Sequence, residues 1–227
     1  EDVFKSYKKK RMLPFYLLVS LELHKIFNLN NTYITTYQVG GKTFEFPSII
    51  KITKNFVRLI GLWIAEGHLH NGREVVFDFG IKEKSYVEEI EKTAKELFLR
   101  NVHKIVDRKK NKIRVIIGST ILYYLFKSLG MRTGAKNKNI PFFIFNLSRE
   151  LKLEFLKALY QGDGCFVKNR RMLIYTTASE ELARDLLFLE LALGLFPTIT
   201  TKKHKGLGKK ASTAYVISIY GKELNTL

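Results

Sequence analysis

Two acidic residues in this sequence each stand between an apolar, helix-like run and a glycine. Glu66 ends "LIGLWIAEG" and Asp163 ends "FLKALYQGDG". A helix C-terminus carries partial negative charge, so a carboxylate there is disfavoured unless something compensates it. Mg²⁺ would do so, because it binds one or two carboxylates and completes its shell with water and phosphate oxygens. If the two acids meet, we predict a site for two or more Mg²⁺ ions shared between them.

Small residues favour a close approach of the two helices that carry these acids. In each helix two of them are four positions apart and so share one face. The predicted helix interface consists of Gly61, Ala65, Ala158 and Gly162. Gly67 and Gly164 follow the acids as further residues of the metal site, and each fits a left-handed C′ position that ends its helix.

The acid–glycine runs belong to a duplicated unit. After each run come two strand-like segments, a helix, and two more strand-like segments, in the order helix–hairpin–helix–hairpin–helix. We therefore predict an α+β fold with two pseudo-symmetric halves, 46–138 and 139–227. Residues 1–45 match neither copy and form a basic extension, either a DNA-contacting element or a remnant of a junction with another domain.

Composition points to a polyanionic partner. The net charge is +18, which favours nucleic acid over an anionic membrane surface. No apolar run approaches the ~20 residues of a membrane span. Cys165 is the only cysteine, which excludes an internal disulfide and a zinc site built from several cysteines. A cytoplasmic, nucleic-acid-facing protein is the expected class.

Basic residues gather in the predicted hairpin turns and beside them. Such residues could contact DNA phosphates and fix the register of binding, although a single lysine-rich turn is more often a solvated tip. The predicted DNA-binding residues are Arg73, Lys82, Arg108, Lys109, Lys110, Lys112, Lys168, Arg170, Arg171, Lys202, Lys203 and Lys205.

Two histidines follow the first acid closely. His68 and His70 could be metal ligands, but we favour their interpretation as turn residues that contact DNA. No Ser–His–Asp or Cys–His arrangement is evident, so phosphodiester chemistry here would depend on metal ions.

The two acid–glycine runs resemble the signature helices of the LAGLIDADG homing endonucleases in their single-chain form. The segments "FPSIIKITKNFVRLIGLWIAEG" and "NIPFFIFNLSRELKLEFLKALYQGDG" are most similar to endonuclease domains found inside inteins, and the resemblance covers 46–227. It implies an αββαββα fold in each half and two saddle-shaped sheets lying along the DNA major groove. It also implies a monomer that makes a Mg²⁺-dependent double-strand break in a long asymmetric site, with the metal held by Glu66 and Asp163.

Some residues depart from the family pattern. Trp63 and Ile64 replace the usual isoleucine and aspartate of the first motif, and Ala158 replaces a glycine in the second. The last change should widen the helix contact slightly.

The family often adds a lysine near the second strand of the first hairpin, where it tunes the nucleophilic water. Lys84 fits this role, with Lys82 as the alternate, although a surface lysine at the start of a helix is an equally good interpretation. In the second half Thr177 stands where such a lysine would be, so one strand's cleavage lacks this assistance.

Two other functions remain open. An RNA-binding intron maturase or a catalytically silent DNA-binding protein could share this fold, and the presence of both acids counts against each. The chain begins with Glu1 and ends with Leu227, so we do not expect it to splice as given. The truncated last helix, "KELNTL", indicates a fragment.

Overall fold

The computed structural model describes most of the chain and divides it into two compact units. The described residues are 22, 25, 28–30, 32–37, 43–204 and 212–221. One unit comprises Glu1–Lys51 with Leu97–Leu99, and the other comprises Ile52–Glu96 with Arg100–Leu227. Lys205, the final segment 222–227 and most of the basic extension lie outside the described residues.

The first unit contains an antiparallel hairpin. Its strands are β1 (Tyr33–Tyr37) and β2 (Thr43–Pro47). They pair in register from Tyr33 opposite Pro47 to Tyr37 opposite Thr43.

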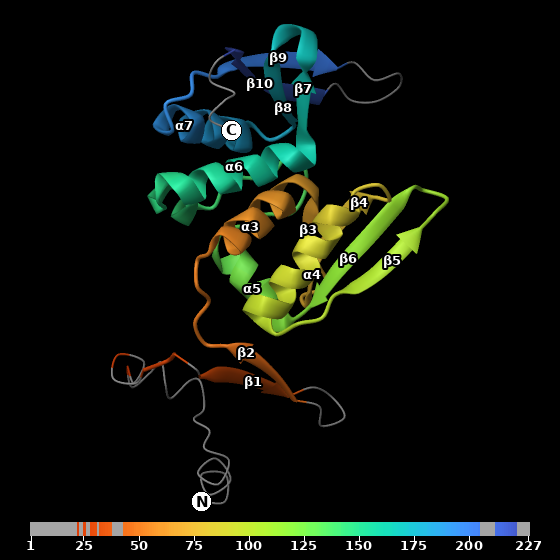
Figure 1. The fold of residues 1–227 in the computed structure, drawn as a ribbon, viewed down its shortest axis with the longest axis vertical. Coiled ribbons are helices and arrows are strands. Elements are labelled where there is room, and N and C mark those ends of the chain that lie inside the picture. The colour runs from red at the N-terminus through yellow and green to blue at the C-terminus, as the bar shows by residue number, and fades with distance from the viewer. Residues whose placement is uncertain are drawn as a thin grey trace, which may run out of the picture. The chain divides into compact units, whose positions relative to one another are not determined.

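The second unit contains two successive copies of one element order (Figure 1). The first copy consists of α3 (Lys54–Glu66), β3 (Gly67–His70), β4 (Glu74–Gly80), α4 (Lys84–Phe98), β5 (His103–Asp107), β6 (Lys112–Gly118) and α5 (Thr120–Ser128). The short 3₁₀ helix η2 (Phe142–Asn146) then leads into the second copy. That copy consists of α6 (Arg149–Asp163), β7 (Gly164–Val167), η3 (Lys168–Arg170), β8 (Met172–Thr177), α7 (Glu180–Ala192), β9 (Thr198–His204) and β10 (Ser212–Tyr220).

Both copies build a four-stranded antiparallel sheet with the same strand order. The orders are β3-β4-β6-β5 and β7-β8-β10-β9. Strand β6 shows why these segments form half-buried strands: Ile113, Val115 and Ile117 are buried, while Lys112 and Arg114 on the other face remain partly exposed. A period of two is the pattern of a strand with one face on the core. The predicted α+β class and duplicated order are confirmed, and only the closing helix of the second copy falls outside the described residues.

Several helices begin at the residues that sequence rules favour. Thr53, Ser148 and Ser179 cap α3, α6 and α7, and each side-chain oxygen accepts an N–H from the first turn of its helix. Such bonds satisfy donors that the helix cannot pair internally. The caps therefore fix where the two acid-bearing helices start.

Helices α3 and α6 pack directly on each other (Figure 1). A Cβ placed on Gly61 would lie 2.7 Å from the Phe155 carbonyl oxygen and 3.0 Å from the Ala158 Cβ. A Cβ on Gly162 would overlap the Ala65 Cβ. The small residues therefore lie at the helix contact, and their lack of bulk permits it.

The glycines after the two acids differ from the expectation. Gly67 has φ −106° and Gly164 has φ −81°, so both are extended, and the prediction of a left-handed conformation is wrong. In each copy the chain passes from the helix straight into a strand, which needs extended backbone. Glycine is required there for space, because a Cβ would run into the helix at Trp63 or Tyr160.

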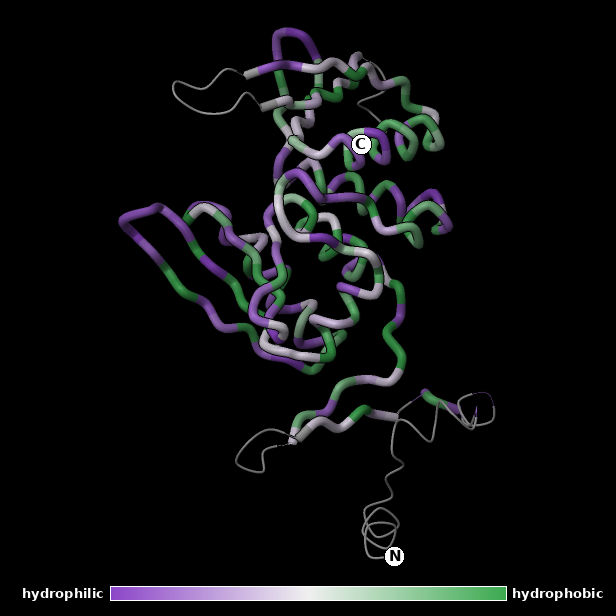
Figure 2. The backbone as a smooth tube through the Cα atoms, turned by 180° about the vertical axis from the view of Figure 1, so that it is seen from behind, coloured by the Kyte–Doolittle hydropathy of each residue, from purple (hydrophilic) through white to green (hydrophobic). Residues whose placement is uncertain are grey.

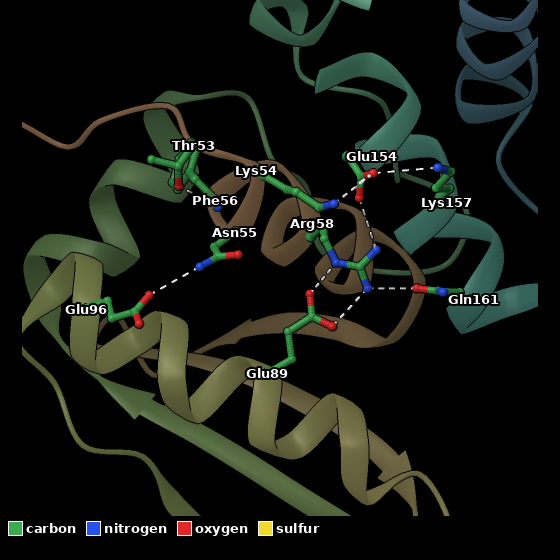
Figure 3. A network of polar contacts seen from close by, with 10 residues as sticks. All are labelled: Thr53, Lys54, Asn55, Phe56, Arg58, Glu89, Glu96, Glu154, Lys157 and Gln161. Carbon is green, nitrogen blue, oxygen red and sulfur yellow. Dashed lines mark hydrogen bonds and ion pairs between the residues drawn. The ribbon is translucent and has the colours of Figure 1, made fainter. Parts of the chain in front are cut away.

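A network of ion pairs joins the two halves beside this helix contact (Figure 3). Arg58 of α3 donates to both carboxylate oxygens of Glu89 on α4 and to Gln161 Oε1 on α6, the last at 2.8 Å. Glu154 of α6 in turn lies 3.1 Å from Lys54 and 3.6 Å from Arg58. The mostly buried guanidinium of Arg58 therefore has partners in both halves and links them.

A buried acid in the second half gives stability an unusual pH dependence. Glu190 is 0% exposed and accepts a hydrogen bond of 2.6 Å from the Tyr160 hydroxyl. Burial raises the pKa of Glu190 from 4.5 to about 8, and the hydrogen bond from Tyr160 opposes this only in part. The folded state thus holds a proton that the unfolded chain releases.

We expect the wild-type free energy of unfolding to fall as pH rises through this window. The contribution of Glu190 is complete below pH 4.5 and is lost as pH rises through about 8, because its pKa is higher in the folded state. The loss should reach ~1.4 kcal/mol per pH unit. Urea unfolding of wild type and Glu190→Gln across this range measures it. An unchanged slope in the variant would contradict the assignment, and Glu180→Gln, at the exposed start of the same helix, is the control.

No helix among the described residues is both long enough and apolar enough to cross a membrane.

Candidate active site and nucleic-acid interface

The two predicted acids end the two helices that pack together. Glu66 is the last residue of α3 and is half-buried, whereas Asp163, the last residue of α6, is more open to solvent. Burial, followed by the negative charge of Asp163, raises the pKa of Glu66 from 4.5 to about 7. Burial also raises the pKa of Asp163, while Lys138 and a 3.4 Å hydrogen bond from the Tyr175 hydroxyl oppose that rise. The two carboxylates therefore form one electrostatically coupled group.

A lysine from the segment between the two halves serves both acids. Lys138 Nζ donates a 2.6 Å hydrogen bond to the carbonyl oxygen of Ala65, the residue before Glu66. Burial lowers the pKa of Lys138, and the charges of Asp163 and then Glu66 oppose this shift. Sequence reasoning missed this residue. Its segment "GAKNKNIP" has no period and no acid beside the lysine, so only the folded path of the chain reveals the contact.

The predicted catalytic lysine lies elsewhere. Lys84 is an exposed residue in the first turn of α4, and its alternate Lys82 is exposed in the loop before that helix. The charge from this region that acts on Glu66 is that of Glu83, which raises its pKa. Thr177 of β8 is buried and accepts a hydrogen bond of 3.1 Å from the Ser179 amide. The structure thus brings Lys138 to the acids, and a role for Lys84 stays a prediction.

The carboxylate oxygens of Glu66 and Asp163 are ligands that suit a hard divalent cation. Among the described residues no three His, Cys, Asp or Glu side chains form a cluster that could hold a metal. Two carboxylates would leave most of the coordination shell to water and phosphate oxygens, which is the mode that Mg²⁺ favours. A divalent cation would also relieve the mutual repulsion that raises the pKa of Glu66. The acid pair therefore fits a divalent cation such as Mg²⁺, and a role for Gly67 and Gly164 in such a site stays a prediction.

The two histidines belong to a strand rather than to the predicted turn. His68 and His70 lie in β3, and His68 Nδ1 lies 3.8 Å from Asp78 Oδ2 on the neighbouring strand β4. Burial is the main cause of a lowered pKa at His68. His68 pairs with Val76 of β4. Asp78 lies two positions after Val76, so its side chain is on the same face of the sheet as the His68 imidazole.

Asp78 organises the polar face of the first sheet. Arg114 of β6 donates to both of its carboxylate oxygens, at 2.8 Å and 3.1 Å, and Lys112 Nζ lies 2.9 Å away. Burial raises the pKa of Asp78, but these two cations outweigh that effect and lower it overall. Lys112 therefore does not lie in the hairpin turn with its basic neighbours: it is the first residue of β6, and its ammonium reaches Asp78.

The other predicted DNA-binding residues lie at strand ends and turns. Arg73 and Lys82 are exposed in the loops at the two ends of β4. The exposed hairpin tips carry Arg108, Lys109 and Lys110 between β5 and β6, and Lys168, Arg170 and Arg171 between β7 and β8. Both tips are strongly hydrophilic (Figure 2). Lys202 and Lys203 are exposed on β9.

Curated relatives match most of this chain but only a small part of their own length. The uncharacterized protein MJ1054 of Methanocaldococcus jannaschii is 34% identical over 82% of this chain and 22% of that protein. The ATP-dependent DNA helicase Hel308 of Thermococcus kodakarensis is 29% identical over 82% of this chain and 18% of the helicase. The DNA polymerase II large subunit of the same organism is 31% identical over 84% of this chain and 10% of the subunit.

Solved structures share the duplicated architecture. Mesophilic variants of the homing endonuclease I-DmoI align with a TM-score of 0.56 at 17% identity, covering 77% of this chain and 93% of theirs. I-DmoI in complex with DNA and Mn gives 0.54 at 17% identity over 74% of this chain and 90% of its own. Full-length DUF199/WhiA from Thermatoga maritima gives 0.53 at 15% identity over 78% of this chain and 54% of its own.

A protein-family model matches the second half of the chain. The LAGLIDADG-like domain matches residues 150–226, which contain α6 with its terminal acid and the sheet that follows. The first half repeats the same elements in the same strand order. The chain therefore has the single-chain LAGLIDADG fold, with its two motif helices packed together and an acid at the end of each.

Proposed function

We propose that this chain is a site-specific DNA endonuclease that makes a Mg²⁺-dependent double-strand break. The observation that carries the proposal is the meeting of Glu66 and Asp163 at the ends of two packed helices, with the Lys138 ammonium beside both. A surface ion pair does not explain this arrangement, because burial penalises all three charged groups. Strongly shifted groups gathered at one place favour a functional site.

The residues of the site have distinct tasks in phosphodiester hydrolysis. Mg²⁺ held by these residues would supply activation of water and neutralisation of phosphate charge. Glu66 and Asp163 present the oxygens that hold such ions, one from each half. Lys138 places a positive charge where the phosphate's negative charge grows, and its bond to the Ala65 carbonyl fixes that position. Because hydrolysis adds water across one phosphodiester bond of each strand, a centre built from both halves suits a double-strand break.

Sheet composition supports a long, asymmetric target. The face of the first sheet that carries Asp78 also carries His68, Lys112 and Arg114, with Val76 and Ile105 beside them. The corresponding face of the second sheet carries Ile174, Thr176, Thr200 and Lys202, beside the buried Ser218. Arginine and lysine can pair with guanine in the major groove, and threonine methyl groups can contact thymine. Two halves with such different faces would read two different half-sites. In this proposal the chain acts as a monomer on DNA and has no membrane partner.

The relatives support a role as a mobile insertion, specifically an intein-associated endonuclease in a DNA-containing compartment such as the cytoplasm. One relative is named a DNA helicase and another a DNA polymerase subunit, yet each contains a segment similar to this chain. The matching segment makes up between 10% and 22% of the length of these three relatives. A module that recurs inside different hosts is what homing would produce.

A catalytically silent DNA-binding protein is the second candidate. The WhiA structure aligns nearly as well as the endonuclease structures do, with a TM-score of 0.53. An RNA-binding maturase belongs to the same class of alternatives. These functions would leave the two acids and Lys138 without a task.

Plasmid cleavage tests the proposal. A plasmid that carries the host gene's uninterrupted insertion site should be converted to linear DNA with Mg²⁺ and not with a chelator. The same plasmid without that site is the control. Tight, specific binding of the site without any nicked or linear product would instead support the silent DNA-binding protein.

We expect the β5–β6 turn to contribute phosphate contacts. Neutralising Arg108, Lys109 and Lys110 together should weaken binding to every duplex and flatten the slope of log K against log salt by up to ~3 units. These residues are exposed at a hairpin tip, so the preference for the cognate site over a random duplex should change little. Salt titrations of binding to both duplexes measure the slope. An unchanged slope would mean that this turn faces solvent in the complex.

A further inference from the structure

The backbone at Lys138 and at Ile140 is hydrogen-bonded to the second half. The Ser179 hydroxyl donates a 2.6 Å hydrogen bond to the backbone carbonyl of Lys138. The Asp185 carboxylate accepts a 2.8 Å hydrogen bond from the Ile140 amide. Both contacts come from α7 or its cap, so one helix of the second half holds the backbone on either side of Asn139.

Ser179 is itself held in place. Its side-chain oxygen accepts the Leu182 amide at 3.1 Å as the N-cap of α7, and its own amide donates to Thr177 Oγ1. Ser179 is 0% exposed. The hydroxyl therefore uses both its donor and its acceptor capacity, and the end of β8 and the start of α7 fix its position.

The Lys138 ammonium reaches the opposite half. Its backbone is tied to α7, whereas Nζ bonds to the Ala65 carbonyl at the end of α3. A lysine side chain is long and has several rotatable bonds. The place of its charge therefore depends on where its backbone is anchored.

We propose that Ser179 and Asp185 are positioning residues that set the place of the Lys138 ammonium between the two acids. This inference rests on the proposed function, because it concerns the same site. Loss of either contact frees the segment to shift, and a misplacement of about 1 Å can cost about a hundredfold in rate.

Kinetics of cleavage test the inference. Ser179→Ala and Asp185→Ala should each lower kcat by roughly 10-fold to 100-fold while KM stays unchanged. Ser179→Thr keeps the hydroxyl and Asp185→Asn keeps an oxygen acceptor, so both should recover most of the rate. In a Lys138→Met background, Ser179→Ala should add no further loss, because residues that act through one another are not additive.

Matched controls separate positioning from folding. Ser119 is a buried N-cap on α5 that accepts the Leu122 amide, so Ser119→Ala removes a comparable cap without touching Lys138. Glu180→Gln removes an exposed ion pair with Arg184 within α7. Both variants should keep the wild-type kcat. An equal loss of kcat in Ser119→Ala and Ser179→Ala would overturn the inference.

A second readout does not depend on cleavage. Acetylation of surface amines by a water-soluble reagent, followed by mass spectrometry, reports the accessibility of Lys138 in the free protein. Ser179→Ala and Asp185→Ala should acetylate Lys138 several-fold faster than wild type and the two controls. Unchanged acetylation would refute the positioning of Lys138 by Ser179 and Asp185 even if the wild type cleaves DNA. Faster acetylation in a chain that never cleaves would support this positioning and reject the proposed function.

Discussion

Replacement of Glu66 by glutamine should reduce double-strand cleavage by more than about a hundredfold, since the loss of outer-shell partners of metal ligands already costs about 10–100-fold. Asp163→Asn should have an effect of the same size. Each change keeps the shape of the side chain but removes a charge from a pair that would hold the cation. Cleavage rate under saturating Mg²⁺ is the measurement, with nicked and linear products followed separately.

Folding and DNA binding distinguish this loss from a general defect. Burial raises the pKa of Glu66 to about 7, so its charge weakens the folded state above the unfolded value of 4.5 and the glutamine variant should be at least as stable at about pH 8. Binding of the target in the absence of metal should remain close to wild type. Glu150→Gln, at the exposed start of α6, is the control. Normal cutting of both strands by Glu66→Gln would contradict the site assignment.

Gly61→Leu should destabilise the protein severely. A Cβ at this position would already lie 2.7 Å from the Phe155 carbonyl, which belongs to the backbone of α6 and cannot turn aside. Overpacking typically costs ~1–3 kcal/mol and more where backbone must move. Because α3 and α6 carry the two acids, their separation should also lower cleavage further than the loss of stability explains. Thermal unfolding and cleavage at a temperature well below the transition measure the two effects.

An open glycine provides the matched control for this substitution. A Cβ at Gly118, at the exposed end of β6, would meet no atom within 4 Å. Gly118→Ala should therefore leave the thermal midpoint nearly unchanged. If Gly61→Leu behaved like this control, α3 and α6 would not pack through the face that carries Gly61.

The sequence predicted the architecture because the duplicated pattern repeats strong local signals. Gly61 with Ala65, and Ala158 with Gly162, identify one face of each motif helix, and the structure places them at the helix contact. Serine is a residue type that helix N-caps favour, and the Ser179 oxygen accepts the Leu182 amide. Such features depend on neighbours three or four positions away, so they can be read from one sequence.

Features that depend on the path of the chain could not be read in this way. Lys138 lies more than 70 positions from Ala65, its contact, and the polar segment around it has no periodicity. Lys112 looked like one more basic residue of a turn until the register of β6 placed it opposite Gly80, within reach of Asp78. Gly67 was assigned a common helix-ending conformation, whereas the direct passage into β3 requires an extended one.

The two carboxylates that we propose as metal ligands come at a cost to stability. The charge of Asp163 raises the pKa of Glu66, and both acids stand at helix ends that disfavour anions. Lys138 compensates only in part, since burial disfavours its charge as well. We infer that this residual imbalance is what a divalent cation relieves when DNA brings its phosphates to the site.

The central claim is that both acids hold metal at one place between the two halves. Anomalous diffraction from crystals of the chain bound to its target duplex and Mn²⁺ tests it most directly, because manganese stands in for magnesium and its anomalous signal distinguishes it from water. Anomalous peaks are expected within coordination distance of the carboxylates of both Glu66 and Asp163, roughly 2–2.5 Å. Peaks that lie away from these two residues, or their absence at saturating Mn²⁺ in a cleavage-competent complex, would contradict it.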